Sequence, residues 1–165
     1  MKNTVIKLNI YLLVLVTILT GCGSDSPSDL YSSLEGELSK EDQVNFDSLR
    51  SHVQKFIQLN NELTMLLEEM KNNDELEAAI DTMDIANQEA LYIYNLIELD
   101  STPENKTLRL VKQQIQKSIE EYMKAMTTQL EGISSGNTKK TDTGYHEAQK
   151  IVEEINEFYK QTNHP

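Results

Sequence analysis

Cysteine is nearly absent from this chain, which has 165 residues and a single cysteine, Cys22. One cysteine cannot form a disulfide within the chain, so the fold must be stable without a covalent cross-link. A folded part of roughly 125 residues is long enough for this, because it buries about two-thirds of the surface that its unfolded chain exposes. We therefore expect one domain with a single hydrophobic core and no redox chemistry.

Basic residues are also scarce. The chain has 15 Lys and Arg residues against 27 Asp and Glu residues, which gives a formal net charge of −12. Such a charge repels nucleic-acid phosphates and anionic lipid headgroups. The close basic pair Lys139–Lys140 is too small to reverse this repulsion. We expect no nucleic-acid partner.

Sequence motifs that carry catalysis are missing. Di-iron helical bundles use Glu-x-x-His on facing helices, and this sequence has no such motif. It also lacks recognisable Ser-His-Asp, Cys-His and Gly-rich phosphate-binding motifs. The doublets Glu68–Glu69, Glu120–Glu121 and Glu153–Glu154 point about 100° apart on a helix, so they do not form paired carboxylates. We interpret them as solvated, helped by pairs such as Glu120 with Lys124, and predict no catalytic residues and no enzyme activity.

Candidate ligands for a metal or a haem group are few and scattered. His52 has no second ligand three or four residues away, so we interpret it as a residue at the boundary of the core. His146 follows Asp142 by one helical turn, a spacing at which a carboxylate and an imidazole could share a weak metal ion or form a salt bridge. Several methionines lie on apolar stripes, where thioethers commonly fill gaps; the five considered are Met65, Met70, Met83, Met123 and Met126. We expect no metal and no cofactor.

Only the N-terminus carries a long apolar run. Residues 1–21 begin with Lys2 and Lys7, continue with the apolar segment 10–19 and end in small residues. This order is typical of a secretion signal peptide. The apolar segment is about half of the roughly 20 residues that a membrane-spanning helix needs. We therefore expect the segment to be removed, which would leave 13 basic and 27 acidic residues and a net charge of −14.

The tetrad Leu19-Thr20-Gly21-Cys22 at the end of this segment resembles the lipobox of bacterial prelipoproteins. The resemblance implies cleavage between Gly21 and Cys22 and transfer of a diacylglyceryl group to the Cys22 sulfur. Two acyl chains, at about 0.8 kcal/mol per buried methylene, would hold the protein on the extracytoplasmic face of the cell membrane. In composition the chain is also similar to small helical envelope lipoproteins of Bacillus-type bacteria.

The rest of the chain divides into a short polar segment and an acidic helical part, residues 39–165. Residues 22–38 are rich in Gly, Ser, Asp and Pro, which favours a flexible tether that would hold the domain about 20 Å from the membrane. Beyond it, apolar residues recur at intervals of three and four. This pattern predicts four helices, over residues 39–72, 74–99, 103–134 and 142–162, with a polar loop over 132–143.

Local signals support these helix boundaries. Ser39 is a good N-cap for the first predicted helix, and Asn73 can cap the second. Thr102 followed by Pro103 is typical of the start of the third. That helix has the most regular apolar period in the sequence; its apolar positions are Leu108, Val111, Ile115, Ile119, Tyr122, Met126, Leu130 and Ile133.

Four amphipathic helices with short connections predict an all-α fold, an antiparallel up-down four-helix bundle. The alternative is a three-helix bundle with a loosely docked fourth helix. Since no chemistry is evident, we expect a membrane-anchored, non-catalytic interaction module for a protein or cell-envelope partner. The alternative function is a ligand-binding or sensing bundle whose interior, which contains Met and Tyr residues, opens for an apolar small molecule.

Overall fold

The computed structural model describes residues 26–32, 34, 38–73 and 75–162. The predicted signal peptide at residues 1–21, its cleavage site after Gly21 and the predicted lipidation site Cys22 lie outside the described residues. The described part of the chain is all-helical, as the sequence predicts, and contains no strand. Its elements are α2 (Pro27–Ser32), α3 (Lys40–Asn72), α4 (Leu76–Leu99), α5 (Lys106–Ser134) and α6 (Thr138–Thr162).

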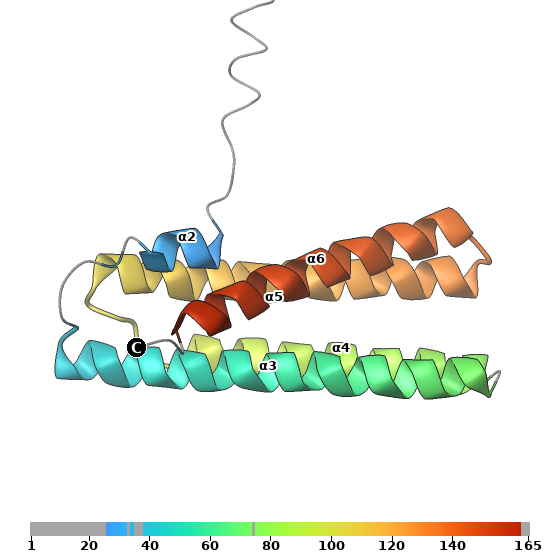
Figure 1. The fold of residues 1–165 in the computed structure, drawn as a ribbon, viewed down its shortest axis with the longest axis horizontal. Helices are drawn as coiled ribbons and strands as arrows, with labels where there is room; N and C mark the ends of the chain where they lie inside the picture. The colour runs from blue at the N-terminus through green and yellow to red at the C-terminus, as the bar shows by residue number, and fades with distance from the viewer. Residues whose placement is uncertain (1–25, 33, 35–37, 74, 163–165) are drawn as a thin grey trace, which may run out of the picture.

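The four long helices form two layers (Figure 1), with α3 beside α4 in one layer and α5 beside α6 in the other. The most extensive contact joins α5 to α6, and α4 links the layers by packing on α5. This arrangement is the predicted antiparallel up-down bundle. The alternative with a loosely docked fourth helix is wrong, because α6 packs along α5.

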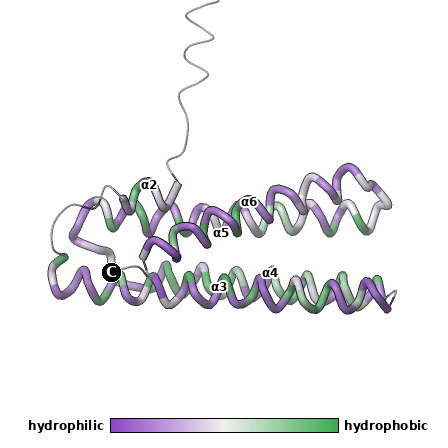
Figure 2. The backbone as a smooth tube through the Cα atoms, in the orientation of Figure 1, coloured by the Kyte–Doolittle hydropathy of each residue, from purple (hydrophilic) through white to green (hydrophobic). Residues whose placement is uncertain are grey.

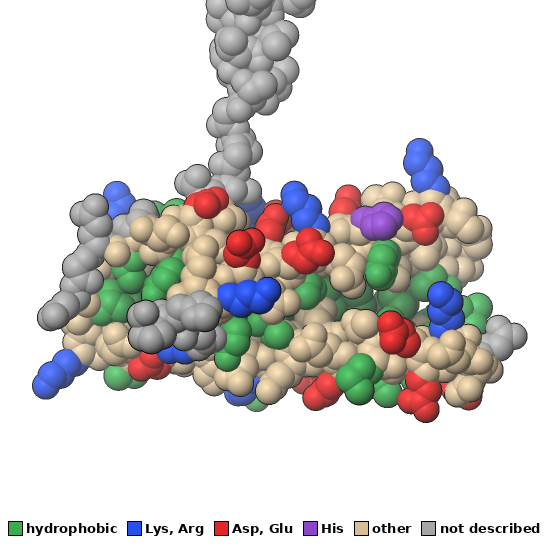
Figure 3. Space-filling model, viewed as in Figure 1, with side chains coloured by type: hydrophobic (Ala, Val, Ile, Leu, Met, Phe, Trp, Pro, Cys, Tyr) green, Lys and Arg blue, Asp and Glu red, His purple; other side chains and the backbone are tan. Residues whose placement is uncertain are grey.

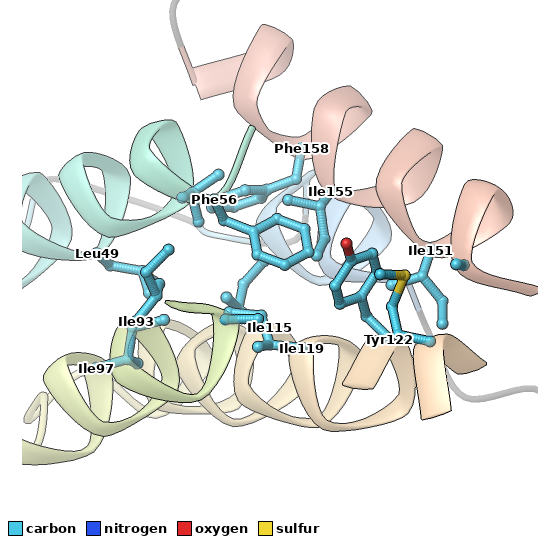
Figure 4. Close-up of a cluster of buried hydrophobic side chains, with 14 of the residues drawn as sticks. Leu49, Phe56, Ile93, Ile97, Ile115, Ile119, Tyr122, Ile151, Ile155 and Phe158 are labelled. Carbon is cyan, nitrogen blue, oxygen red and sulfur yellow. The ribbon is translucent and has the colours of Figure 1, made fainter. Parts of the chain in front are cut away.

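The core lies between the layers and draws apolar side chains from all four long helices. Figure 2 shows that hydrophobic and hydrophilic residues alternate along these helices, as expected for amphipathic helices in a bundle. The regular apolar period predicted for α5 is confirmed, since its first six members are buried and its last two pack against the core. In Figure 4, Phe56 of α3 lies close to Tyr122 of α5 and to Ile155 and Phe158 of α6. Each such side chain contributes about 1.5–3 kcal/mol by leaving water.

Part of the predicted tether is helical, which corrects the expectation of a flexible segment over residues 22–38. Helix α2 packs against α5 and α6. Tyr31 stacks on Phe46 with 5.5 Å between ring centroids and meets Phe158 edge-on at 5.8 Å. At its start, the Ser26 hydroxyl accepts a hydrogen bond from the Asp29 N–H at 3.2 Å and donates one to the Asp29 carboxylate at 2.8 Å. This capping pair, with Pro27 in the first helical position, is a helix signal that the composition of the segment obscured.

Two helix starts lie a few residues later in the chain than predicted. Asn105, not Thr102, caps α5, and its side chain accepts a hydrogen bond from the Leu108 N–H at 3.0 Å. Helix α4 begins at Leu76, and Asn73 is the C-cap of α3 instead of the N-cap of α4. The predicted cap at Ser39 is confirmed, since its side chain accepts from the Asp42 N–H at 3.1 Å.

The loop predicted over residues 132–143 is mostly helical. The turn between α5 and α6 takes only residues 135–137, with Gly136 at a φ of 66°, and α6 begins at Thr138. Helix α6 starts close to α5 because glycines leave room: a Cβ built on Gly144 would lie 2.5 Å from the Gln129 backbone nitrogen. A polar, glycine-containing sequence therefore forms a helix here without large apolar side chains.

Some large apolar side chains of the long helices are on the surface. The exposed fractions of Leu66, Leu76 and Tyr145 are 43%, 62% and 48%. In α6 the buried side contains Ile151 and Phe158, whereas the neighbouring Val152 and Tyr159 are only partly buried. Among the described residues, no helix is both long and apolar enough to cross a membrane.

Candidate binding site

The two layers part in the half of the bundle that contains the α5–α6 turn, and a groove opens there between α3, α5 and α6. Its volume is about 430 Å³, within the range of roughly 300–1,000 Å³ that is typical of small-molecule sites. Figure 3 shows a recess with apolar side chains between the layers in this half of the molecule. The groove is lined by Asn60, Leu63, Thr64, Leu67, Glu68, Lys71, Tyr122, Met126, Gln129, Tyr145, Ala148 and Gln149.

Each of the three helices forms one wall of the groove, and helical spacing brings its lining residues to the same side of that helix. On α5, Tyr122 and Met126 are four residues apart, so their side chains lie one above the other on the same face. On α3, Asn60 and Leu63 are three residues apart and face them across the groove. Ala148 of α6 is small, so it covers less of the space between the layers than a larger side chain would. Each of these five side chains is at least nine-tenths buried.

Asn60 brings a hydrogen-bond acceptor to the wall of the groove. Its exposed fraction is 8%, and its side-chain Nδ2 donates to the Phe56 carbonyl of the preceding turn at 2.8 Å. No described group donates a hydrogen bond to its Oδ1. The Oδ1 atom of this amide is therefore an acceptor whose capacity the described residues do not use.

Tyr122 brings a hydroxyl that is more deeply buried. Its ring is fixed by an edge-to-face contact with Phe56, with 5.0 Å between centroids. Its hydroxyl has no hydrogen-bond partner among the described residues. Burial raises the pKa of the Tyr122 phenol well above its ordinary value of 10.0, so the group is neutral at physiological pH. A buried polar group without a partner costs about 1–3 kcal/mol.

The charges at the groove are few and of both signs. Glu68 and Lys71 line it from the same helix, and the remaining lining residues are uncharged. Within the described residues, no group of three or more His, Cys, Asp or Glu side chains is placed to hold a metal ion. The groove is therefore suited to a neutral molecule with an apolar body and polar atoms that pair with Asn60 and Tyr122.

His52, which the sequence placed at the core boundary, is buried beside a carboxylate that sequence spacing did not reveal. Its Nε2 lies 3.1 Å from Oδ2 of Asp100, the C-cap of α4. The Ser48 hydroxyl donates to the same Oδ2 at 2.7 Å and lies 3.3 Å from His52 Nε2. In a Ser-His-Asp triad the serine and the aspartate bind opposite ring nitrogens, whereas both contact Nε2 here. The cluster joins α3 to α4 and lacks the arrangement of a nucleophile with its base.

A second polar cluster fixes the start of α5. Asp42 of α3 is 4% exposed and accepts hydrogen bonds from the Glu104 N–H at 2.9 Å and the Asn105 N–H at 3.1 Å. A carboxylate at this place satisfies unpaired backbone donors and lies at the positive end of the helix dipole. Nearby, Lys112 donates to the Asp100 carbonyl at 2.7 Å. Burial lowers the pKa of Lys112, and the charge of Asp100 partly opposes this shift.

The other candidate ligands are not brought together. His146 lies in α6, where its ring meets Tyr145 at 5.5 Å between centroids. Met65 is 69% exposed, whereas Met83 is buried in the core. The predicted surface pair is confirmed, with Lys124 Nζ 2.6 Å from the Glu120 carboxylate.

The periodicity of the sequence does not reveal the groove, because the polar residues of the groove lie within apolar stripes. Asn60 stands between Phe56 and Leu63 on the buried side of α3, which is the one available signal, a buried amide in an otherwise apolar row. Tyr122 belongs to the buried stripe of α5, as its period predicts, but a period does not show whether its hydroxyl has a partner. No protein-family model, curated protein or solved structure matches this chain.

Proposed function

We propose that this chain is a non-catalytic binding module, anchored by lipid on Cys22 at the outer face of the cell membrane, and that its site is the α3–α5–α6 groove. The observation that carries the proposal is that two residues of the groove wall, Asn60 and Tyr122, each carry a side-chain group without a partner among the described residues, Oδ1 of Asn60 and the hydroxyl of Tyr122. Apolar pockets with a few converging polar groups are the usual form of small-molecule sites.

The ligand that this site favours is a neutral amphipathic molecule. Leu63, Met126 and Ala148 offer an apolar surface to its body. Asn60 Oδ1 requires a donor, and the hydroxyl of Tyr122 can donate to an acceptor. A carboxamide provides both in one group. An anion is disfavoured because Glu68 lies at the groove and the whole chain carries a net charge of −12.

The anchor would hold the bundle close to the membrane. Helix α2 begins at Pro27 and packs on the bundle, so only four residues lie between Cys22 and this helix. Four residues reach at most about 14 Å, less than the 20 Å expected for a tether of 17 residues. A lipidated chain would therefore have α2 at its membrane end.

A matched pair of probes tests the ligand class. The mature lipid-anchored protein in phosphatidylcholine nanodiscs is titrated with 4-butylbenzamide and with its charged isostere 4-butylbenzoate, and backbone NMR shifts are followed. We expect the amide to shift resonances of residues that line the groove and the carboxylate to have little effect. Equal shifts with both probes, or shifts outside the groove only, would contradict the proposed ligand class.

Two variants of α3 localise the effect. Thr64→Trp places an indole at the exposed edge of the groove and should abolish binding of the amide. Gln58→Trp introduces the same side chain at an exposed position of α3 outside the groove and should leave binding unchanged. If both variants behave alike, the groove is not the site.

A protein or cell-envelope partner is the second candidate function. The observation that favours it is an exposed apolar row on α4, which lies apart from the groove. Recovery of a specific partner by the immobilised lipoprotein, lost when this row is altered but kept in Thr64→Trp, would assign the interaction to α4.

A further inference from the structure

Helix α4 carries apolar side chains on its outer side as well as on its core side. Its core side buries Met83, Ala90 and Ile97. On the outer side, the exposed fractions of Ile85, Tyr92 and Leu99 are 60%, 58% and 83%. We call these three residues the α4 row. Single exposed apolar residues are common, but three large ones in register are a feature of contact surfaces.

The spacing of the α4 row places its members in line. They are seven residues apart, and positions seven apart return to nearly the same side of a helix, with a drift of about 20°. From the first to the last, the row extends about 21 Å along the helix. This spacing is that of one of the two apolar positions of a coiled-coil heptad, so the row offers a single line of contacts to a partner helix.

The charges beside the α4 row are all negative. Asp81, Asp84 and Glu89 are exposed on the same helix and form no ion pair with a described residue. Glu98 is exposed too, but it has a cation nearby, since burial lowers the pKa of Lys112 in α5 and the charge of Glu98 partly opposes this shift. Between Leu76 and Leu99 there is no Lys or Arg, whereas each of the other long helices contains basic residues. The α4 row is thus a line of apolar side chains whose own helix supplies acidic neighbours and no basic ones.

We infer that the α4 row docks an amphipathic helix of a partner protein whose own apolar seam is flanked by Lys and Arg. Apolar seams give such helix pairs their stability, and flanking charges of opposite sign select the partner. A second copy of this chain would place Asp81, Asp84 and Glu89 against their equivalents, and α4 supplies no cation to compensate them. An anionic membrane surface would be repelled by the same border. This inference is independent of the groove.

Two synthetic helical peptides test the charge requirement. Both carry Leu at heptad a and d positions, one with Lys and the other with Glu at the flanking e and g positions. Their binding to the mature lipid-anchored protein in phosphatidylcholine nanodiscs is measured by fluorescence anisotropy at two salt concentrations. We expect the Lys peptide to bind at least about tenfold more tightly than the Glu peptide, and less tightly at high salt. Equal affinity for the two peptides would overturn the inference.

A matched pair of variants tests the location. Tyr92→Ser removes the central member of the row, and Met65→Ser changes a residue of α3 that is 69% exposed. Because central aromatic residues carry much of the energy of an interface, we expect Tyr92→Ser to weaken binding of the Lys peptide by about tenfold and Met65→Ser to leave it unchanged. Equal loss in both variants, or none in either, would contradict the assignment to α4.

Sedimentation of the detergent-solubilised protein tests whether a second copy of this chain, instead of a partner helix, occupies the α4 row. We expect a monomer in the absence of peptide. A dimer that is lost on Tyr92→Ser would instead identify a second copy of this chain as the occupant and overturn the inference.

Discussion

Replacement of Tyr122 by phenylalanine should stabilise the protein in the absence of ligand. The ring would keep its edge-to-face contact with Phe56, while the hydroxyl, which has no partner among the described residues, would be removed. An unsatisfied buried polar group costs about 1–3 kcal/mol, and the small space left behind offsets part of this gain. We expect the free energy of unfolding to rise by about 1 kcal/mol, which corresponds to a Tm about 3 °C higher for a domain of this size.

The assay is urea denaturation followed by circular dichroism, with thermal melting as a second measurement. Tyr92→Phe is the matched control, because Tyr92 is 58% exposed and its hydroxyl is solvated; its unfolding free energy should not change. A loss of stability in Tyr122→Phe would refute the reasoning, since it would mean that the hydroxyl has a partner in the ligand-free protein.

High pH gives an independent readout of the same group. Since burial raises the pKa of Tyr122 above 10.0 in the folded state, the unfolded chain loses this proton first as the pH rises. Ionisation of this group therefore leaves the free energy of unfolding unchanged below pH 10 and lowers it above pH 10, by up to about 1.4 kcal/mol per pH unit. Stability should fall less steeply above pH 10 in Tyr122→Phe than in the wild type, and equal slopes would contradict the assignment.

Three further outcomes are expected. A Cβ on Gly144 would lie 2.5 Å from a backbone nitrogen of α5, so Gly144→Ala should lower the free energy of unfolding by about 3 kcal/mol. Gly136→Ala is the control and should lower it by about 1 kcal/mol, because Gly136 has a φ of 66° but no atom within 4 Å of the added Cβ. Similar losses for the two variants in urea denaturation would count against the close approach of α6 to α5. Asp42→Ala should lower the free energy of unfolding by about 2–3 kcal/mol, because two backbone N–H donors lose their acceptor. Asp42→Asn should lower it less, because its amide oxygen can still accept a hydrogen bond, and hydrogen exchange at the start of α5 would report the difference. Cys22→Ser should release the protein from the membrane fraction, and unchanged retention would refute the lipid anchor.

Much of the architecture follows from the sequence alone. The apolar period of α5 from Leu108 to Ile133 predicts a long amphipathic helix, and its first six members are buried as expected. The cap at Ser39 is equally local, since Ser39 and Asp42 are three residues apart. Such features need only neighbours along the chain, which is why periodicity and capping predict the helices and the bundle.

The connections at both ends of the bundle depended on tertiary contacts. Segment 26–32 has the composition of a tether, and its helix packs Tyr31 between Phe46 and Phe158, which are distant in the sequence. The first turns of α6 are polar, and they are held by the close approach of Gly144 to α5. Composition reports what a segment prefers by itself and not which surface it meets.

The sequence by itself determined the helix class, the acidic charge and the side of each helix that is apolar. Only the tertiary structure decided which polar groups meet: Asp42 with N–H groups 62 and 63 residues away, and Asn60 with Tyr122 at one groove. The physical reason is that a periodic pattern indicates which residues of one helix face the core, whereas the hydrogen-bond partners of a polar group can come from several helices. The groove exists because α6 follows α5 and leaves α3, and that divergence is a property of helix packing.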